Sequence, residues 1–179
     1  MSFPATPVLA DPCVRLVPFS PNHLTDDYVA WLNDPEIVRF SEQRHRRHDL
    51  AGCRAYAESM WNGANHFWAL ETAGGRHVGN ITAYVNAPNL VADVAIMVGD
   101  RSVRGQGVGL AGWTLACDWL LGPGGMRKVT AGTMSVNRPM LGVMHKSGMR
   151  IEGVRTAQFL WEGQCVDMVM AARFAEEQA

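Results

Sequence analysis

A glycine-rich stretch between Gly99 and Ala111 holds the residues best suited to bind a ligand. An apolar run that reads as a buried strand precedes it, and a helical pattern follows it. Glycines strip side chains from such a helix entry, and the exposed backbone N–H groups and the helix dipole there favour a bound anion such as a pyrophosphate. Neighbouring arginines would add positive charge beside that anion. The residues concerned are Arg101, Arg104, Gly105, Gly107 and Gly109.

Two well-known phosphate loops do not fit this spacing. A P-loop ends in Gly-Lys-Ser/Thr, whereas Gly109 is followed here by Leu110 and Ala111, with neither the lysine nor the hydroxyl. A dinucleotide-binding loop needs GxGxxG, and Leu110 stands where its third glycine would be. The stretch is therefore an anion-binding helix start of another type, or a helix start whose glycines serve close packing alone.

The segment Arg104–Gly109, RGQGVG, resembles the Q/R-x-x-G-x-G/A acetyl-CoA-binding motif of the GNAT superfamily of N-acetyltransferases. Three further segments are similar, in order, to the branch that includes ribosomal-protein N-terminal acetyltransferases. They are WLNDPEIVRF (Trp31–Phe40), HVGNITAY (His77–Tyr84) and Asn137 with Lys146–Met149. The resemblance covers residues 14–174 and implies a mixed α/β, GNAT-like fold, with a central, mostly antiparallel sheet of splayed strands flanked by about four helices.

The resemblance also implies how acetyl-CoA would be held. In this family the strand before the loop splays from its neighbour and offers backbone groups to the pantetheine arm. The loop amides hold the pyrophosphate, the asparagine contacts the cofactor arm, and no metal takes part. The residues that would bind the cofactor are Ile96, Met97, Val98, Arg101, Arg104, Gly105, Gln106, Gly107, Val108, Gly109 and Asn137.

Asp93 is the candidate catalytic base. The family often places a carboxylate on the central strand, and Asp93 stands at the matching position in VADVAIMV. Alternation puts Asp93, Ala95 and Met97 on one face of this strand. A carboxylate in so apolar a strand either forms a structural hydrogen bond or serves function, by accepting a proton or holding the ammonium of the acceptor. Both roles remain open for Asp93.

The sequence leaves the proton donor for the departing thiolate unassigned. Many family members place a tyrosine in the helix after the asparagine, where this chain has Met144. The related branch often has a serine where this chain has Met140. His145 is the nearest titratable residue, and it also reads as an ordinary solvated helix residue. Because a thiolate is a good leaving group, water would suffice.

A polar stretch from Ser41 to His48, SEQRHRRH, lies beside the expected acceptor cleft. Two of its histidines are one helical turn apart, but no third ligand and no HExxH motif accompany them, so no metal site is expected. Its cationic residues suit a phosphorylated or otherwise anionic acceptor, and aromatic faces stack on sugars and bases. The residues expected near the acceptor are Trp31, Glu42, Arg44, His45 and Trp68.

The composition favours one globular domain. The chain has 179 residues, of which 47% are hydrophobic and 18% charged, so it has ample material for a core. A formal net charge of -1 argues against nucleic acid as a main partner. No apolar stretch reaches the roughly 20 residues needed to cross a membrane, and the N-terminus does not read as a signal peptide. Four dispersed cysteines favour reduced, mostly packed thiols in the cytoplasm.

The hydrophobic pattern predicts a flexible arm (residues 1–13), a single domain (14–174) and a tail (175–179). Strands are expected over 14–19, 66–71, 77–85, 91–99, 128–134, 151–161 and 165–174. Helices are expected over 21–32, 50–62, 107–121 and 137–146. The expected core face of the third helix is Leu110, Ala111, Leu115 and Leu120.

Together these features predict an acetyl-CoA-dependent N-acetyltransferase that acts on a primary amine. The acceptor is a protein N-terminus or a small molecule such as an amino sugar on a nucleotide carrier, and the cationic 41–48 segment slightly favours a small anionic acceptor. A non-catalytic acyl-CoA-binding or sensor module is the alternative, favoured by Met140 and Met144. A structural or interaction protein is the third hypothesis. Family similarity also suggests a homodimer through the C-terminal strands.

Overall fold

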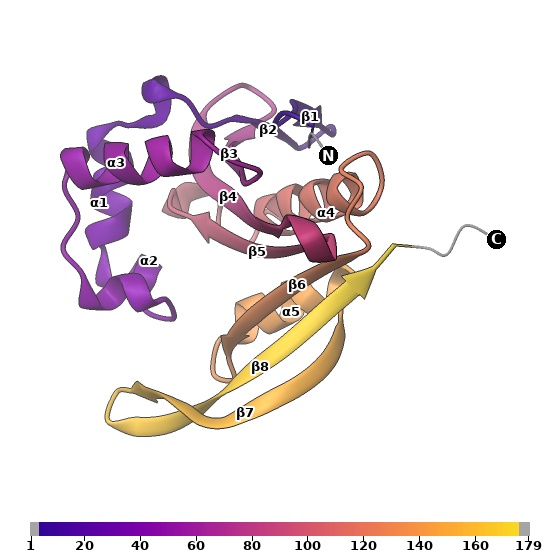
Figure 1. Cartoon of the computed structure of the whole chain (residues 1–179). Helices are drawn as coiled ribbons and strands as arrows, with labels where there is room; N and C mark the ends of the chain where they lie inside the picture. Colours follow the sequence, from indigo (N-terminus) through magenta and orange to yellow (C-terminus); the bar gives the residue numbers. More distant parts are fainter. Residues whose placement is uncertain (1–3, 176–179) are drawn as a thin grey trace.

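A single open sheet organises the molecule (Figure 1). The computed structural model describes residues 4–175, so the start of the expected arm and all but the first residue of the expected tail lie outside the described residues. Within this range the strands have the spatial order β1-β2-β3-β4-β5-β6-β8-β7. They are β1 (Leu9–Ala10), β2 (Val14–Pro18), β3 (His66–Thr72), β4 (His77–Asn86), β5 (Val91–Val98), β6 (Lys128–Met134), β7 (Arg150–Trp161) and β8 (Gln164–Phe174).

Helices cover both faces of this sheet. One hydrophobic cluster packs α4 and α5 against it, and a second packs α1 and α3 against the opposite face. None of the helices between residues 4 and 175 is long and apolar enough to span a membrane. The helices are α1 (Asp26–Asn33), α2 (Pro35–Val38), α3 (Leu50–Trp61), α4 (Val108–Leu121) and α5 (Arg138–Lys146), with 3₁₀ turns η1 (Pro21–His23), η2 (Glu42–His45), η3 (Ala87–Asn89) and η4 (Arg101–Val103).

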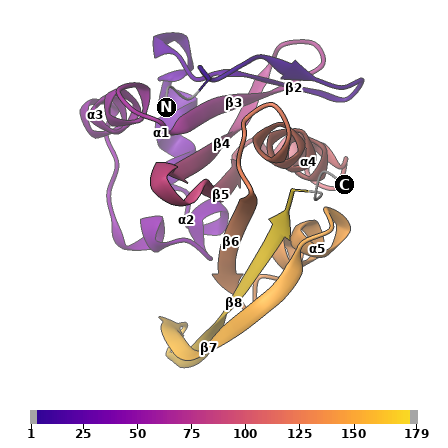
Figure 2. The same cartoon turned by 45° about the vertical axis from the view of Figure 1, so that its right-hand side comes forward.

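The sheet splits at its only parallel pair within the described residues, β5 and β6. These strands pair only from Val91 to Asp93, which lie opposite Lys128 to Thr130. Beyond this point β6 continues to pair along its whole length with β8. In Figures 1 and 2, β6, β8 and β7 slope away from the half of the sheet formed by β1 to β5. The predicted splayed, mostly antiparallel sheet is therefore confirmed.

The first expected helix, over residues 21–32, is wrong in its N-terminal part. The chain forms η1 first, and α1 begins only after Thr25, whose hydroxyl accepts a hydrogen bond from the N–H of Tyr28 at 3.2 Å. Asp34 then ends α1 and also caps α2, because its carboxylate accepts from the N–H of Glu36 at 2.9 Å. Local side-chain caps thus outcompete one continuous helix.

The N-terminal arm is packed along part of its length rather than loose. Leu9 and Ala10 form β1, which pairs with β2. The carbonyl of Pro7 accepts a hydrogen bond from the indole N–H of Trp68 at 2.9 Å, and the hydroxyl of Thr6 lies 3.1 Å from Nδ1 of His66. These contacts satisfy polar groups of buried side chains, which explains why the arm follows the sheet.

The cysteine and core predictions hold only in part. All four cysteines fall within residues 4–175 and are unbridged, but Cys13 and Cys165 are exposed while Cys53 and Cys117 are buried. Burial raises the pKa of Cys117 to about 12. On α4, Leu120 is buried as expected. Ala111 and Leu115 are partly buried and pack against the same cluster, whereas Leu110 does not belong to it. The other fully buried residues of that helix are Val108, Gly112, Trp113, Ala116 and Cys117.

Replacing Gly79 by alanine is expected to destabilise the sheet. A Cβ atom at this position would lie 2.2 Å from the backbone oxygen of Met97 and 3.0 Å from Cα of Val98, so β4 and β5 would have to move apart. We expect a loss of about 2–3 kcal/mol in the free energy of unfolding, measured with urea. Gly142→Ala on α5 is the control, because its Cβ meets nothing within 4 Å and should stabilise the helix by about 0.5–1 kcal/mol.

Stability should fall between pH 6.5 and pH 4 because of His66. This side chain is 2% exposed, and burial lowers its pKa to about 4. Since the folded-state pKa lies below the unfolded value, the unfolded chain takes up a proton first, and stability decreases as the pH falls through this window. The expected contribution is about 2–3 kcal/mol. Urea unfolding at pH 7 and pH 4.5 should show a smaller pH-dependent loss for His66→Gln than for the wild type.

Candidate active site

The point where β5 and β6 separate is the centre of the candidate site. After Asp93, the side of β5 that faces β6 has no strand partner among residues 4–175 along Val94–Val98. An unpaired strand edge offers a row of backbone donors and acceptors to an extended ligand. The expected alternation is confirmed, since Met97 packs on the α1 and α3 side whereas Ile96 and Val98 pack on the α4 side.

The glycine loop at the end of β5 is built as an open helix entry. Gly105 and Gly107 have φ angles of 76° and 80°, which favour glycine, and Gly107 is the N-cap of α4. A Cβ atom at either position would meet nothing within 4 Å, so both glycines border open space. A Cβ at Gly109 would lie 3.3 Å from Cγ2 of Val98, because the helix start lies directly against β5.

The backbone amides of this loop are available to an anion. Across residues 4–175, no backbone acceptor is found for the N–H groups of Gly105, Gly107, Val108 and Gly109. The first N–H groups of a helix need partners from outside the helix, and the helix dipole favours a negative one. The loop can therefore accept an anion, and its binding of the diphosphate of coenzyme A stays a prediction.

The polar side chains around the loop divide into structural and available groups. The guanidinium of Arg101 donates to the carboxylate of Asp34 at 2.5 Å and holds the pKa of that carboxyl below its ordinary value. Gln106 donates through Nε2 to the carbonyl of Ser102 at 2.8 Å, which ties the loop to itself. Arg104 is exposed and has no ion pair within the described part of the chain. Of the three, Arg104 is the one free to reach a bound anion.

Asp93 lies at the last paired position before the split. Its Oδ1 accepts a hydrogen bond from the hydroxyl of Thr130 on β6 at 2.7 Å. Partial burial raises the pKa of Asp93, and the Thr130 hydrogen bond opposes that rise. The second carboxylate oxygen, Oδ2, makes no hydrogen bond within residues 4–175. The structure therefore gives Asp93 a structural hydrogen bond and also leaves it one oxygen for a substrate.

Two tyrosines that no sequence motif indicates lie beside Asp93. Tyr84 on β4 is the direct cross-strand partner of Asp93, and its hydroxyl lies 2.6 Å from the hydroxyl of Tyr56 on α3. Burial raises the pKa of Tyr56 above its ordinary value, so this phenol stays neutral at physiological pH. The short turn from β4 to β5 could have indicated the Tyr84 register, whereas nothing local links Tyr56 to it.

The helix α5, where the family resemblance would place a proton donor, offers no side chain for that task. Asn137 caps α5, since its Oδ1 accepts from the N–H of Met140 at 3.3 Å, and its Nδ2 donates to the hydroxyl of Thr133 at 3.0 Å. Met144 is buried in the core. His145 is exposed on the outer side of the helix. Asn137 thus positions α5 in this structure, and its contact with a cofactor stays a prediction.

The acceptor residues expected near one another fall into two places. Arg44 on η2 donates to the carbonyl of Ser41 and the carboxylate of Glu42, both at 2.9 Å, and reaches the carbonyl of Leu160 on β7 at 3.4 Å. Trp31 lies elsewhere, packed against Gly99 and edge-on to His77. Of the expected residues, Arg44 and His45 border a pocket of about 330 Å³. The pocket is lined by Leu32, Asn33, Pro35, Val38, Arg39, Gln43, Arg44, His45, Arg46, Trp161 and Glu162.

Trp68 does not lie where the sequence analysis placed it. It is 0% exposed and belongs to the hydrophobic cluster on the α4 face, where its ring stacks with that of His66 and meets Trp119 edge-on. Strand alternation decides this, because Phe67 and Ala69 take the α1 and α3 face and leave Trp68 the opposite one. Trp68 is a core residue and not part of an acceptor pocket.

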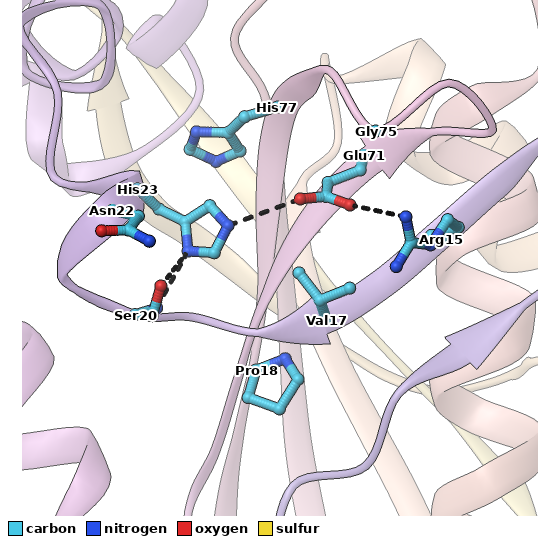
Figure 3. A pocket seen from close by; sticks show the side chains of 9 residues that line it. All are labelled: Arg15, Val17, Pro18, Ser20, Asn22, His23, Glu71, Gly75 and His77. Atoms are coloured by element: carbon cyan, nitrogen blue, oxygen red, sulfur yellow. Dashed lines mark hydrogen bonds and ion pairs between the residues drawn. The ribbon is translucent and has the colours of Figure 1, made fainter.

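A second pocket, of about 550 Å³, lies at the β2, β3 and η1 edge (Figure 3). Glu71 is shared there between Arg15 at 3.7 Å and His23 at 3.5 Å, while the N–H of Ser20 donates to Nδ1 of His23 at 2.9 Å. Burial and the neighbouring His23 lower the pKa of His77 to about 4, so His77 is neutral.

No group of three or more His, Cys, Asp or Glu side chains among residues 4–175 is arranged to hold a metal.

Comparison with known proteins agrees with this geometry. The family model described as "Acetyltransferase (GNAT) domain" matches residues 14–150. No curated protein gives a significant sequence match. The matched residues include β2 to β6, the glycine loop and α5.

Solved structures share that architecture at low sequence identity. RimL, a ribosomal L7/L12 α-N-protein acetyltransferase in complex with coenzyme A, has a TM-score of 0.84 and 13% identity over 95% of this chain and 99% of its own. Spermidine N-acetyltransferase from Vibrio cholerae, in complex with CoA and spermine, has a TM-score of 0.80 and 15% identity, over 90% of this chain and 95% of its own. A GNAT-family acetyltransferase from Bacillus anthracis has a TM-score of 0.81 and 14% identity, over 95% of this chain and 99% of its own. At these identities the likeness concerns the fold.

Proposed function

Since this chain belongs to the GNAT family of acetyltransferases, we propose that it transfers the acetyl group of acetyl-CoA directly to a primary amine. The observation that carries this proposal is the separation of β5 from β6 at Asp93, next to the open glycine entry of α4. The loop amides would bind the diphosphate, with Arg104 beside it, and the free edge of β5 around Ile96, Met97 and Val98 would align the pantetheine arm.

The reaction then needs few groups from the protein. Asp93, with its free Oδ2, takes the proton from the acceptor ammonium, and the amine nitrogen attacks the thioester carbon. A backbone N–H on the open edge of β5 stabilises the oxyanion. The oxyanion collapses and breaks the C–S bond, water takes the second proton of the attacking nitrogen, and water protonates the departing thiolate, which leaves the amide and coenzyme A. The buried Met144 and the exposed His145 support solvent as that proton source.

The acceptor stays open between two classes. The solved relatives include an acetyltransferase of a ribosomal protein and one of spermidine, so both protein N-termini and small amines have precedent in this fold. Arg44 and His45 at the η2 pocket support a small anionic acceptor, such as an amino sugar on a nucleotide carrier. A cytoplasmic location and a homodimer through β7 and β8 remain predictions from the sequence.

Coenzyme A release tests the proposal. The purified chain is incubated with acetyl-CoA and a panel of spermidine, Ala-Ala-Ala and a nucleotide-linked amino sugar, and coenzyme A is measured by chromatography because exposed Cys13 and Cys165 would react with thiol reagents. We expect amine-dependent release with at least one acceptor. Thermal stabilisation by acetyl-CoA without release from any acceptor would instead favour the non-catalytic acyl-CoA-binding module, for which saturation at about 100 times Kd adds roughly 2.7 kcal/mol.

A further inference from the structure

The geometry around Asp93 points to a binding site for the reacting nitrogen of the acceptor. We propose that Tyr84, held in place by Tyr56, binds the acceptor amine together with Asp93; this inference rests on the proposed acetyl transfer. Tyr84 would contact the substrate, and Tyr56 would be a positioning residue. The site lies on the α1 and α3 side of the sheet, on the face opposite the α4 cluster.

The register of the sheet brings the two contacting groups together. Tyr84 and Asp93 are direct partners in the antiparallel pair of β4 and β5. Directly opposed residues point to the same face with Cβ atoms about 4.5–5.5 Å apart, so the phenol ring and the carboxylate stand side by side. This pair sits at the position where β6 leaves β5. A nitrogen that approaches the opening therefore meets both side chains.

The hydrogen bonds already present leave acceptors for that nitrogen. Asp93 uses Oδ1 for the hydroxyl of Thr130 and keeps Oδ2. The hydroxyl of Tyr84 shares one hydrogen bond with Tyr56 at 2.6 Å, and a phenol oxygen can take part in more than one. An ammonium carries three N–H donors and a neutral amine two, so a carboxylate oxygen and a phenol oxygen are suitable partners for either form.

The exposure of the two tyrosines argues against a purely packing role. Tyr84 is 43% exposed, and Asp93 and Ala95, which lie on the same face of β5, are exposed as well. Tyr56 is partly buried, and its ring meets that of Phe67 edge-on at 5.6 Å, which fixes the position of its hydroxyl. A partly buried phenol that is hydrogen-bonded to an exposed one is the arrangement expected of a preorganised contact.

Three tyrosine variants test the inference. Tyr84→Phe should raise KM for the amine about tenfold, the loss of one hydrogen bond to a charged group, with kcat changed less than about twofold. Tyr56→Phe should raise KM for the amine about threefold, since Tyr84 keeps its hydroxyl but loses the hydrogen bond that orients it. Tyr28→Phe is the matched control, because Tyr28 is a buried phenol of the same layer outside the pair. KM for acetyl-CoA should stay unchanged in all three.

A second measurement does not depend on turnover. Protein with ¹³C-labelled tyrosine rings and saturating coenzyme A is titrated with spermidine and with Ala-Ala-Ala, and the Tyr84 signal is assigned by its loss in Tyr84→Phe. We expect that signal to shift with at least one amine and the Tyr28 signal to stay constant. A shift without turnover supports the amine site and refutes the proposed function. Turnover with unchanged amine KM in Tyr84→Phe overturns the amine site alone, and the absence of both shift and turnover overturns both.

Discussion

Asp93→Asn should lower the rate of acetyl transfer by a factor of about 10²–10⁴ while acetyl-CoA binds as before. The asparagine side chain keeps an oxygen that can accept from Thr130, so the hydrogen bond between β5 and β6 survives the change. It cannot take a proton from the ammonium. The loss should therefore appear in kcat, measured as coenzyme A release, and not in the affinity for acetyl-CoA measured by calorimetry.

The role of Asp93 as a base also predicts how the activity of the wild type depends on pH. Burial raises the pKa of Asp93, and the reaction needs the deprotonated carboxylate, so wild-type activity should decrease as the pH falls through that raised pKa. Glu58→Gln on α3 is the control, since it removes an exposed carboxylate without an ion pair in the described residues. If Asp93→Asn retained more than about a third of the wild-type rate, Asp93 would be a structural residue that only links the two strands.

Gly107→Asp should weaken acetyl-CoA binding at least about 100-fold, which corresponds to roughly 2.8 kcal/mol at 1.4 kcal/mol per tenfold. The new carboxylate would stand at the N-cap of α4, among the amides that are without acceptors in the structure. It would compete for those N–H groups and repel a diphosphate placed there. Calorimetric titration with acetyl-CoA measures the effect directly.

Gly107→Asn separates charge from shape in the same experiment. Asparagine has nearly the size of aspartate, tolerates the left-handed conformation about as well, and carries no charge. A Cβ at this position meets nothing within 4 Å, so both variants should fold, which thermal melting can verify. We expect the asparagine variant to lose about tenfold or less in affinity. Equal affinity of both variants with the wild type would show that the diphosphate does not bind at this helix entry.

The cofactor loop and the central strand could be predicted from the sequence because their determinants are local. Gly105 and Gly107 adopt positive φ angles, which glycine permits without steric cost. Asp93 keeps the face that strand alternation assigns to it, since the period of two does not depend on the partners. The splaying of this strand from its neighbour was expected from the family resemblance, and the register of β5 and β6 shows that it begins after Asp93.

Side-chain partners far apart in the chain could not be predicted in this way. α4 is apolar almost all round, so periodicity does not show which of its residues are buried most deeply. The sheet beneath it buries Trp113 completely and Leu115 only in part. Alternation along β3 leaves open whether Trp68 faces the acceptor side or the core. Packing against α4 places Trp68 in the core.

The sequence by itself determined the helix entry that suits a diphosphate and the strand that carries Asp93, because backbone conformation and alternation are properties of neighbouring residues. The tertiary structure decided the surroundings of that carboxylate. Thr130 reaches it from β6, Tyr84 stands opposite it on β4, and Tyr56 reaches Tyr84 from α3. These contacts depend on how the strands register and how the helix packs, and such long-range choices are made by the burial of the whole core.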